Sequence, residues 1–240
     1  ETFVKVRPAA RVCAVTRLTP RLARLAACVL PNRPAADVAT DHARLAIELV
    51  RSGRVDGVIA SDVAPEPLAG ARRNVREAEL ESSIELRLGD GLQTLADDEV
   101  GTVVIAGVGG LLCRRMLEAR IPRGVERLVL QVNSQLPQLR DGLRELGWAL
   151  VDEAIDLSDG RYFITLIAEP SDEPPVLSTR ELEFGPHLRR RREPHYLGWL
   201  RREHERTARV VGTLPPHVDD DAAREARRRL AALRVELSAS

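Results

Sequence analysis

The sequence has only three cysteines, and their spacing matches no common metal site. Cys13, Cys28 and Cys113 form no CxxC pair, and three thiols cannot all form disulfides within one chain. The five histidines also lack cysteine or carboxylate partners at the spacing of metal ligands. We therefore expect a cytoplasmic protein with reduced thiols, no structural zinc and no metal in its chemistry.

Long apolar runs and an excess of charge of one sign are also absent. No stretch of eighteen apolar residues occurs and no signal peptide is visible, so we expect no association with a membrane. The 36 basic residues balance 36 acidic residues. Because a neutral chain exerts no global attraction on nucleic acid, any such binding has to come from local segregation of charge.

Two glycine motifs of nucleotide-binding proteins are missing as well. The sequence GxxxxGK[ST] does not occur, and the turn after the first predicted strand has no GxGxxG. Both motifs hold phosphate groups on backbone amides. Their absence argues against a P-loop NTPase and against an enzyme that uses a nicotinamide cofactor.

Segments with the apolar pattern of strands alternate with segments of helical periodicity through the first two thirds of the chain. The predicted strands span residues 35–39, 55–62, 83–90, 101–107 and 125–131, and the predicted helices span 18–30, 41–53, 65–80, 110–117 and 134–147. A hairpin of strands 148–156 and 161–169 follows. We predict an α/β domain over residues 1–170, with a mostly parallel seven-stranded sheet, an antiparallel edge pair and helices on both faces.

A polar, proline-rich linker at 170–178 separates this domain from an arginine-rich segment. Residues 179–240 are predicted to form a small helical domain, an antiparallel helix pair whose last helix spans 219–238. The stretch 187–211 has eight arginines against three glutamates. With His195, Tyr196 and Trp199 among them, these arginines would suit RNA phosphates and bases. The alternative is a solvated amphipathic helix that packs its apolar side on the first domain.

Acidic residues and glycines follow four consecutive predicted strands. In open α/β sheets, ligands bind beyond the carboxyl ends of the strands. These ends are Asp37-Val38-Ala39-Thr40-Asp41-His42, then Asp62, then Gly89-Asp90-Gly91, then Ala106-Gly107-Val108-Gly109-Gly110. Asp62 could accept both ribose hydroxyls, Asp90 the adenine amino group, and Asp37 or Asp41 the ammonium of a methionine tail. One such residue is usually a turn or cap residue, but four in register favour a site for S-adenosylmethionine (SAM).

From this point the chain resembles a known family, the bacterial tRNA (adenine(22)-N1)-methyltransferases or TrmK family. The resemblance runs from about Leu18 to the C-terminus, through the stretches RLTPRLARLAACVLP, ADVATDHARLA, VIASDVAPEPLAGARRNV, LRLGDGL, VVIAGVGG, LVLQVNS, LVDEAI and FGPHL. It implies a Rossmann-like class I methyltransferase with a helical, coiled-coil-like C-terminal domain, which uses SAM to methylate N1 of an adenine in tRNA.

The resemblance also indicates which residues form the cofactor site. The candidates are Asp37, Ala39, Thr40, His42, Asp62, Val63, Gly89, Asp90, Gly91, Ala106, Gly107, Val108 and Gly109. Gln131 and Asn133 correspond to the segment after the fifth strand. Three residues depart from the family pattern: Ala39 replaces a glycine, Val108 a methionine and Val132 a proline. Two alternatives therefore stay open, a SAM-dependent enzyme with another RNA or small-molecule substrate, and a non-catalytic RNA-binding protein with a degenerate SAM pocket.

Methylation of adenine N1 requires little acid–base chemistry, because this nitrogen is neutral and holds a lone pair near pH 7. The product base is cationic, so an acceptor near the exocyclic amine would favour the transition state. Asp41 is the first candidate for this catalytic role and Asn133 the second. Asp41 could instead bind the methionine ammonium or cap the next helix. His42 could contact the cofactor carboxylate or the target base, or lie in the first turn of that helix.

Overall fold

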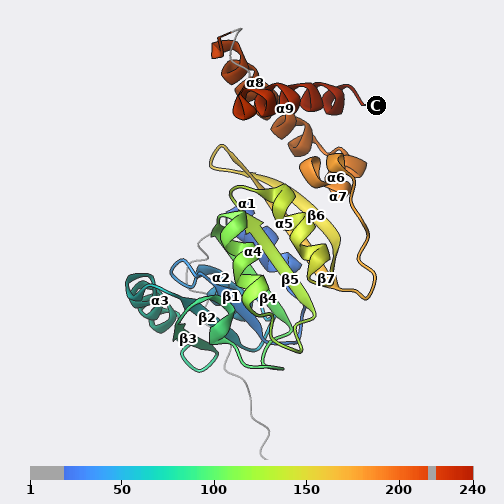
Figure 1. Ribbon diagram of the computed structural model, residues 1–240. Helices are drawn as coiled ribbons and strands as arrows, with labels where there is room; N and C mark the ends of the chain where they lie inside the picture. Colours follow the sequence, from blue (N-terminus) through green and yellow to red (C-terminus); the bar gives the residue numbers. More distant parts are fainter. Residues whose placement is uncertain (1–18, 216–219, 240) are drawn as a thin grey trace, which may run out of the picture.

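The computed structural model describes residues 19–215 and 220–239 (Figure 1). Its sheet has seven strands in the order β3-β2-β1-β4-β5-β7-β6. The strands are β1 Ala35–Val38, β2 Val58–Asp62, β3 Ile84–Leu88, β4 Thr102–Val108, β5 Arg127–Val132, β6 Trp148–Ser158 and β7 Arg161–Pro170. The first five strands are parallel, β7 is antiparallel to β5, and β6 is antiparallel to β7. The predicted fold class is confirmed. Cys13 and the predicted helix start at Leu18 lie outside the described residues.

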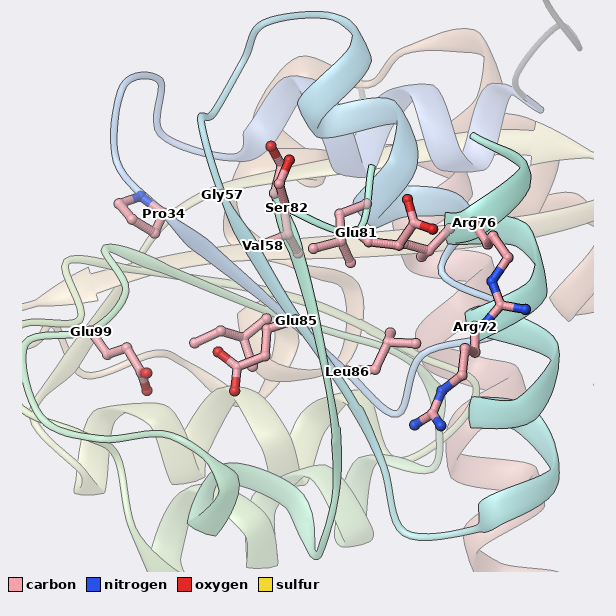
Figure 2. Close-up of a pocket in the computed structure, with 14 residues that line it drawn as sticks. Pro34, Gly57, Val58, Arg72, Arg76, Glu81, Ser82, Glu85, Leu86 and Glu99 are labelled. Carbon is pink, nitrogen blue, oxygen red and sulfur yellow. The ribbon is translucent and has the colours of Figure 1, made fainter. Parts of the chain in front are cut away.

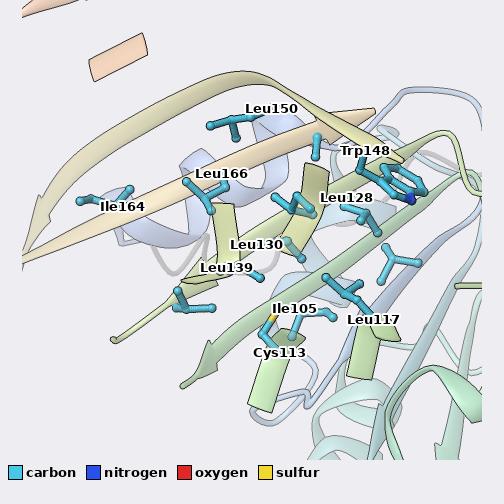
Figure 3. Packing of buried hydrophobic residues seen from close by; sticks show 14 of the residues in the cluster. Ile105, Cys113, Leu117, Leu128, Leu130, Leu139, Trp148, Leu150, Ile164 and Leu166 are labelled. Atoms are coloured by element: carbon cyan, nitrogen blue, oxygen red, sulfur yellow. The ribbon is translucent and has the colours of Figure 1, made fainter. Parts of the chain in front are cut away.

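Helices cover both faces of the sheet, which is why its central strands are buried along nearly their whole length. The helices of one face are α1 Pro20–Cys28, α2 Arg44–Arg51 and α3 Pro65–Glu77, and those of the other are α4 Gly110–Ala119 and α5 Leu136–Glu145, with a short 3-10 helix at Gly91–Thr94. Each face has its own buried cluster. Figure 3 shows the cluster under α4 and α5, where Ile105, Leu128 and Leu130 meet Cys113 and Leu139.

The second helix begins three residues later than its periodicity predicts. The helix expected from residue 41 starts at Arg44. Ala39, His42 and Ala43 all have positive φ, of 59°, 60° and 56°, and a left-handed backbone cannot continue a right-handed helix. The chain therefore makes a tight loop of five residues, 39–43, between β1 and α2.

In the part of the chain that the structure describes, four helices follow the sheet: α6 Thr179–Phe184, α7 Pro186–Arg191, α8 Pro194–Thr213 and α9 Asp221–Ser238. The two short helices, which the sequence pattern does not predict, pack on α5 and β6. Phe184 and Leu188 belong to the same buried cluster as the sheet residues beneath them. The two long helices form the predicted antiparallel pair, which extends away from the sheet (Figure 1).

A buried ion pair joins the short helices to the sheet. The Arg140 guanidinium of α5 donates from Nε to Glu153 of β6 at 2.9 Å, and neither side chain is exposed to solvent. Arg140 also donates to the carbonyl oxygen of Leu182 at 2.6 Å, and Glu153 accepts from the backbone N–H of His187 at 3.0 Å. The pair thus connects groups of α5, β6, α6 and α7.

Candidate functional site

The carboxyl ends of the four strands identified from the sequence meet at one edge of the sheet. Val38 of β1 pairs with Ser61 of β2 and Ile105 of β4, and Asp62 pairs with Leu88 of β3. The loops that leave these strands therefore lie side by side, and the candidate residues of all four strand ends gather at that edge.

Asp37 is the most deeply buried carboxylate of this edge. It is only 6% exposed and accepts a hydrogen bond from the Thr40 hydroxyl at 2.7 Å. Burial raises the pKa of Asp37 to about 6, against the opposing effect of the Thr40 hydrogen bond. Thr40 is itself buried, and its N–H donates to the carbonyl oxygen of Ser61. A cationic ligand would favour the ionised form of this carboxylate.

Asp41 lies at the surface of the same loop. Its side chain is 85% exposed, and its Oδ1 is 3.2 Å from Nε2 of His42. The N-cap residue of α2 is Ala43, and no side chain caps this helix. The alternative interpretation of Asp41 as a helix cap is therefore wrong, and its carboxylate remains available to a ligand.

The imidazole of His42 lies against α3 rather than standing free. A Cβ at Gly70 would come within 2.3 Å of Nδ1 of His42, so only glycine permits this contact. The backbone carbonyl of His42 also accepts from Asn74 at 2.9 Å. His42 is thus half-buried between α3 and the loop, with its Nε2 near Asp41.

The ends of β2 and β3 combine a carboxylate with exposed apolar surface. Asp62 accepts from the N–H of Ala64 through Oδ1 at 2.8 Å, which leaves Oδ2 for a ligand. Val63 is 69% exposed and Leu88 is 63% exposed. Large apolar side chains at such exposure are suited to covering a flat, weakly polar group such as adenine.

The turn after β3 places a further carboxylate beside these groups. The N–H of Gly89 donates to the carbonyl oxygen of Asp62 at 3.0 Å, which fixes the turn against β2. Asp90 is exposed, and Gly91 adopts a φ of 52°. The turn therefore directs Asp90 outward without a competing side chain at Gly91.

The ends of β4 and β5 are joined by hydrogen bonds of Asn133. Its backbone N–H donates to the carbonyl oxygen of Val108 at 3.0 Å, and its Nδ2 donates to that of Gly107 at 2.9 Å. No donor among the residues of 19–215 and 220–239 contacts the side-chain oxygen of Asn133, so this oxygen can accept a hydrogen bond from a ligand. Gly107 has a φ of 87°, while Ala106 is half-buried and Gly109 is the N-cap residue of α4.

Arg21 of α1, which is not among the site residues predicted from the sequence, also lies at this edge. Its Nε donates to Oε1 of Gln131, and its guanidinium lies 4.9 Å from the centre of the Phe163 ring. Burial lowers the pKa of Arg21, although the nearby carboxylates of Asp41 and Asp37 oppose this effect. The contacts link α1, β5 and β7, so no local pattern reveals them; Arg21 does lie in the stretch RLTPRLARL that resembles the family.

These residues fit SAM. Asp37 and Asp41 suit an ammonium group, Asp62 suits ribose hydroxyls, and Val63 with Leu88 offers apolar cover. Among the residues that the structure describes, no group of three or more His, Cys, Asp or Glu side chains could hold a metal ion, and no helix is long and apolar enough to cross a membrane. Cys28 and Cys113 are free.

A cavity of about 720 Å³ lies elsewhere, beside β3 and α3 (Figure 2). It is lined by Pro34 and Gly57, near the amino ends of β1 and β2, and by side chains of mixed charge that include Arg72, Arg76 and Glu85. None of the predicted site residues lines it. Because ligands of open α/β sheets bind at the opposite, carboxyl edge, we do not assign this cavity to the cofactor.

The structure corrects the expectation that Tyr196 and Trp199 stack on RNA bases. Tyr196 is fully buried and donates to Glu236 of α9 at 3.1 Å. Trp199 stacks on Tyr196 with ring centres 5.8 Å apart and meets Phe184 edge-on. Both rings therefore belong to the packing between the helices. His195 is exposed and lies edge-on to Tyr162.

Arginines of the predicted RNA-facing stripe also form contacts within the protein. Arg189 pairs with Glu236 at 3.0 Å and Arg192 with the same carboxylate at 3.4 Å. Arg191 pairs with Asp152 of β6 at 2.7 Å. The exposed arginines of α8 are Arg201, Arg202, Arg206 and Arg209. Of the earlier arginines, Arg189 and Arg192 are half-buried, while Arg190 and Arg191 are exposed as well.

Comparison with known proteins is consistent with this geometry. The family model TrmK, described as tRNA (adenine(22)-N(1))-methyltransferase, matches residues 35–239. The tRNA (adenine(22)-N(1))-methyltransferase of Bacillus subtilis (strain 168) is 30% identical over 221 residues, which cover 90% of this chain and 93% of the relative.

Solved structures agree over nearly the whole chain. The crystal structure of the B. subtilis M1A22 tRNA methyltransferase TrmK has a TM-score of 0.83 at 28% identity, covering 92% of this chain and 99% of that one. Streptococcus pneumoniae Sp1610 in complex with S-adenosyl-L-methionine has a TM-score of 0.82 at 29% identity, covering 92% and 100%.

Proposed function

The chain belongs to the tRNA (adenine(22)-N(1))-methyltransferase family, and on this premise we propose which of its residues bind SAM, bind tRNA and promote methyl transfer. The protein is a SAM-dependent methyltransferase that acts on N1 of an adenine in tRNA, and we propose adenine 22 as its target. The observation that supports this most strongly is the convergence of Asp37, Asp62, Asp90 and Asn133 at one sheet edge.

The cofactor lies across the ends of β1, β2 and β3. Asp37 faces the ammonium group, with Thr40 holding its carboxylate in place. Asp62 accepts the ribose hydroxyls through the oxygen that Ala64 leaves free, and Asp90 accepts the adenine amino group. Val63 and Leu88 cover the adenosine, since both are exposed at this edge.

The remaining small residues leave room for the cofactor rather than bind it through side chains. Ala39, Gly89, Gly91, Ala106, Gly107, Val108 and Gly109 form the backbone that borders the site. His42 supports the loop from the side of α3. Bound SAM supplies an activated methyl group on its sulfonium sulfur.

Asn133 and Asp41 are the proposed catalytic residues. The Nδ2 of Asn133 is tied to the Gly107 carbonyl oxygen, so its Oδ1 can accept from the exocyclic amine of the target adenine. Such a contact orients N1 toward the methyl group and strengthens as positive charge develops on the base. Asp41 has an exposed carboxylate at the same edge, which would stabilise that charge. The adenine has to leave its stack to reach these groups.

The helical domain, residues 179–240, is the proposed tRNA-binding part, next to the catalytic domain of residues 1–170. Arg201 and Arg209, both exposed on α8, are the residues proposed to contact phosphates. A tRNA substrate also implies a cytoplasmic protein.

Nucleoside analysis tests the function. Unmethylated tRNA is incubated with the protein and SAM, digested, and analysed by mass spectrometry, and primer extension then locates the methylated base. We expect 1-methyladenosine at position 22 of tRNA. The same modification at another position would retain the enzyme class and refute the target. SAM binding without any methylated nucleoside would favour the non-catalytic alternative.

Two variants test the catalytic residues in the same assay. Asn133→Ala should lower kcat about 100-fold and leave the affinity for SAM unchanged, because Asn133 faces the base. Asp41→Ala should lower kcat as well. Unchanged turnover of either variant would exclude that residue from catalysis, and a loss of SAM affinity by Asp41→Ala would assign Asp41 to the methionine ammonium instead.

A further inference from the structure

The hairpin of β6 and β7 extends past the carboxyl edge of the sheet. The last pair between β5 and β7 joins Gln131 to Thr165, whereas β6 and β7 stay paired as far as their turn. Residues 161–164 of β7 therefore project beyond the last pair with β5, by about 13 Å at the rise of a β-strand. This hairpin tip, residues 155–164, accepts a hydrogen bond from α8 and lies between the sheet and the helix pair (Figure 1).

Phe163 is the aromatic ring of the hairpin tip that the core does not explain. It is half-buried and packs against neither of the two buried clusters. Successive side chains of a strand alternate between its faces, so Phe163 lies on the side of α1, opposite Tyr162. The other aromatic side chains of the described residues all pack in the cluster under α4 and α5, and they are Trp148, Tyr162, Phe184, Tyr196 and Trp199.

The neighbours of Phe163 place its ring beside the proposed acceptor for the target base. The guanidinium of Arg21 lies 4.9 Å from the centre of the ring, and its Nη2 would lie 3.4 Å from a Cβ at Gly107. The carbonyl oxygen of Gly107 in turn accepts from Nδ2 of Asn133 at 2.9 Å. Phe163 and Asn133 thus border the same short stretch of the edge, and no other ring of the described chain stacks on Phe163.

Arg161 adds a positive charge to the same face of the hairpin tip. It lies two residues from Phe163, and alternate side chains of a strand share a face about 7 Å apart. Its side chain is exposed and has no hydrogen-bond or ion-pair partner within the described part of the chain. Asp159, the carboxylate of the turn, accepts from the hydroxyl of Ser158 at 3.3 Å. The spacing of the ring and this cation suits a base and the phosphate of its own nucleotide.

We propose that the hairpin tip binds the target nucleotide, with Phe163 stacking on the adenine and Arg161 contacting its phosphate. This rests on the proposed function, which places N1 of the adenine at this edge. Stacking on an aromatic ring replaces the stacking that the adenine loses when it leaves its RNA helix. Asn133 contacts the edge of the base and Phe163 contacts its face, so the two side chains together fix the plane in which N1 meets the methyl group.

Steady-state methylation of tRNA tests the stacking contact. Phe163→Leu keeps an apolar side chain but loses the aromatic face, and it should lower kcat/KM for tRNA about 10- to 100-fold, the range of one base stacked on an aromatic ring. Phe163→Tyr keeps the aromatic face and should retain nearly full activity. Both variants should bind S-adenosylhomocysteine like the unaltered protein, because Gln131 still holds Arg21. Thermal unfolding of each variant shows that it is folded.

The salt dependence of tRNA binding tests the phosphate contact. Arg161→Gln should weaken tRNA binding and reduce the slope of log affinity against log salt concentration by about 0.7–1. Arg76→Gln is the matched control, since Arg76 is exposed on α3 beside the cavity of Figure 2, away from the carboxyl edge. This control should keep the original slope.

Three kinds of result would overturn the proposal. A loss of S-adenosylhomocysteine affinity in Phe163→Leu equal to its loss of activity would mean that the ring only supports the cofactor site. Full activity of Phe163→Leu, or an unchanged salt slope in Arg161→Gln, would mean that the hairpin tip does not bind the nucleotide in this way. If the unaltered protein methylated no tRNA, the proposed function itself would fail, a result distinct from the others, in which the unaltered protein is active.

Discussion

At the scale of single residues, Ala39 departs from the family pattern in a conformation that glycine adopts without strain. Its φ of 59° costs a residue with a Cβ about 1–2 kcal/mol. The turn is held in place, because the Thr40 N–H donates to the carbonyl oxygen of Ser61 and the Thr40 hydroxyl donates to Asp37. The methyl group is thus tolerated at a cost in stability, and the loop keeps the carboxylate in place.

Replacing Ala39 with glycine should therefore stabilise the protein. Relief of the left-handed strain exceeds the entropy that glycine adds to the unfolded chain, and the net gain in the free energy of unfolding should be about 0.5–1 kcal/mol. Denaturant unfolding measures this gain. Ala231→Gly, at an exposed position within α9, should instead destabilise the protein by about 0.5–1 kcal/mol. A loss of stability in Ala39→Gly would contradict the strain argument.

Asp37 reduces the stability of the ligand-free protein because its buried carboxylate is hard to ionise. Its pKa is raised from 3.8 to about 6, so the folded state binds this proton more tightly than the unfolded state does. The contribution of Asp37 to the free energy of unfolding therefore rises as the pH falls from about 6 towards 4. This contribution is lowest above pH 6.

Asp37→Asn should remove that pH dependence. Above pH 6 the variant should be more stable than the unaltered protein by about 1–3 kcal/mol, and the difference should shrink towards pH 4. Thermal unfolding of both proteins across this range isolates the effect, since all other groups titrate in both. Titration with SAM should show a large loss of affinity. A variant that is less stable above pH 6 would show that the Thr40 hydrogen bond outweighs burial.

At the scale of elements, α9 is anchored by one buried carboxylate. Glu236 is 1% exposed and is contacted by Arg189 and Arg192 and by the Tyr196 hydroxyl. Arg189 belongs to α7, Arg192 caps the C-terminus of that helix, Tyr196 belongs to α8 and Glu236 to α9. Removal of the carboxylate would leave two half-buried guanidinium groups without their partner, which costs more than the loss of the pair's attraction alone.

Glu236→Leu should therefore loosen the helix pair, with a loss of about 3 kcal/mol. Limited proteolysis should cut first within residues 194–238, and hydrogen exchange should speed up there, while affinity for SAM stays unchanged. Glu225→Leu is the control, because its pair with Arg228 is exposed and should contribute less than about 1 kcal/mol. If both variants resisted proteolysis and hydrogen exchange equally well, apolar packing alone would hold α9 in place.

Elements whose signals are local could be predicted from the sequence, and contacts between distant elements could not. The strands appear as apolar runs because both faces of the sheet are covered, and their ends identify Asp37, Asp62 and Asp90. Ala39, His42 and Ala43 adopt the left-handed conformation that makes α2 begin late. Alanine and histidine do not indicate such a conformation in a sequence. Arg21 and Gln131 are 110 positions apart in the sequence, so their hydrogen bond becomes apparent only when the sheet is assembled.

At the scale of the whole molecule, the positive and negative charges balance, but they are distributed unevenly over the surface. The formal net charge is zero, yet α8 presents Arg201, Arg202, Arg206 and Arg209 to solvent. Arg202 donates to the carbonyl oxygen of Gly160, and Arg206 pairs with Glu203 at 2.8 Å. Arg201 and Arg209 are therefore the better candidates for contact with phosphate.

Affinity for tRNA should fall steeply with salt, and Arg201→Gln with Arg209→Gln should make the fall shallower. Each arginine that contacts a phosphate contributes about 0.7–1 to the slope of log affinity against log salt concentration. The slope measured for the double variant should therefore be smaller by about 1.5–2. Filter binding from 50 to 300 mM salt, roughly the range in which such contacts are resolved, measures it. Arg51→Gln, exposed at the end of α2, should keep the original slope. An unchanged slope in the double variant would locate tRNA elsewhere.

The buried pair of Arg140 and Glu153 has a geometric consequence for recognition. Because it locks α6 and α7 to α5 and β6, the long helices leave the sheet from a rigid joint. An RNA that touches both the helix pair and the catalytic edge has to present its two contact points at one fixed separation. The protein would then select its adenine by the distance between these two contact points. A nucleotide inserted between them in the RNA would bring a different base to the site.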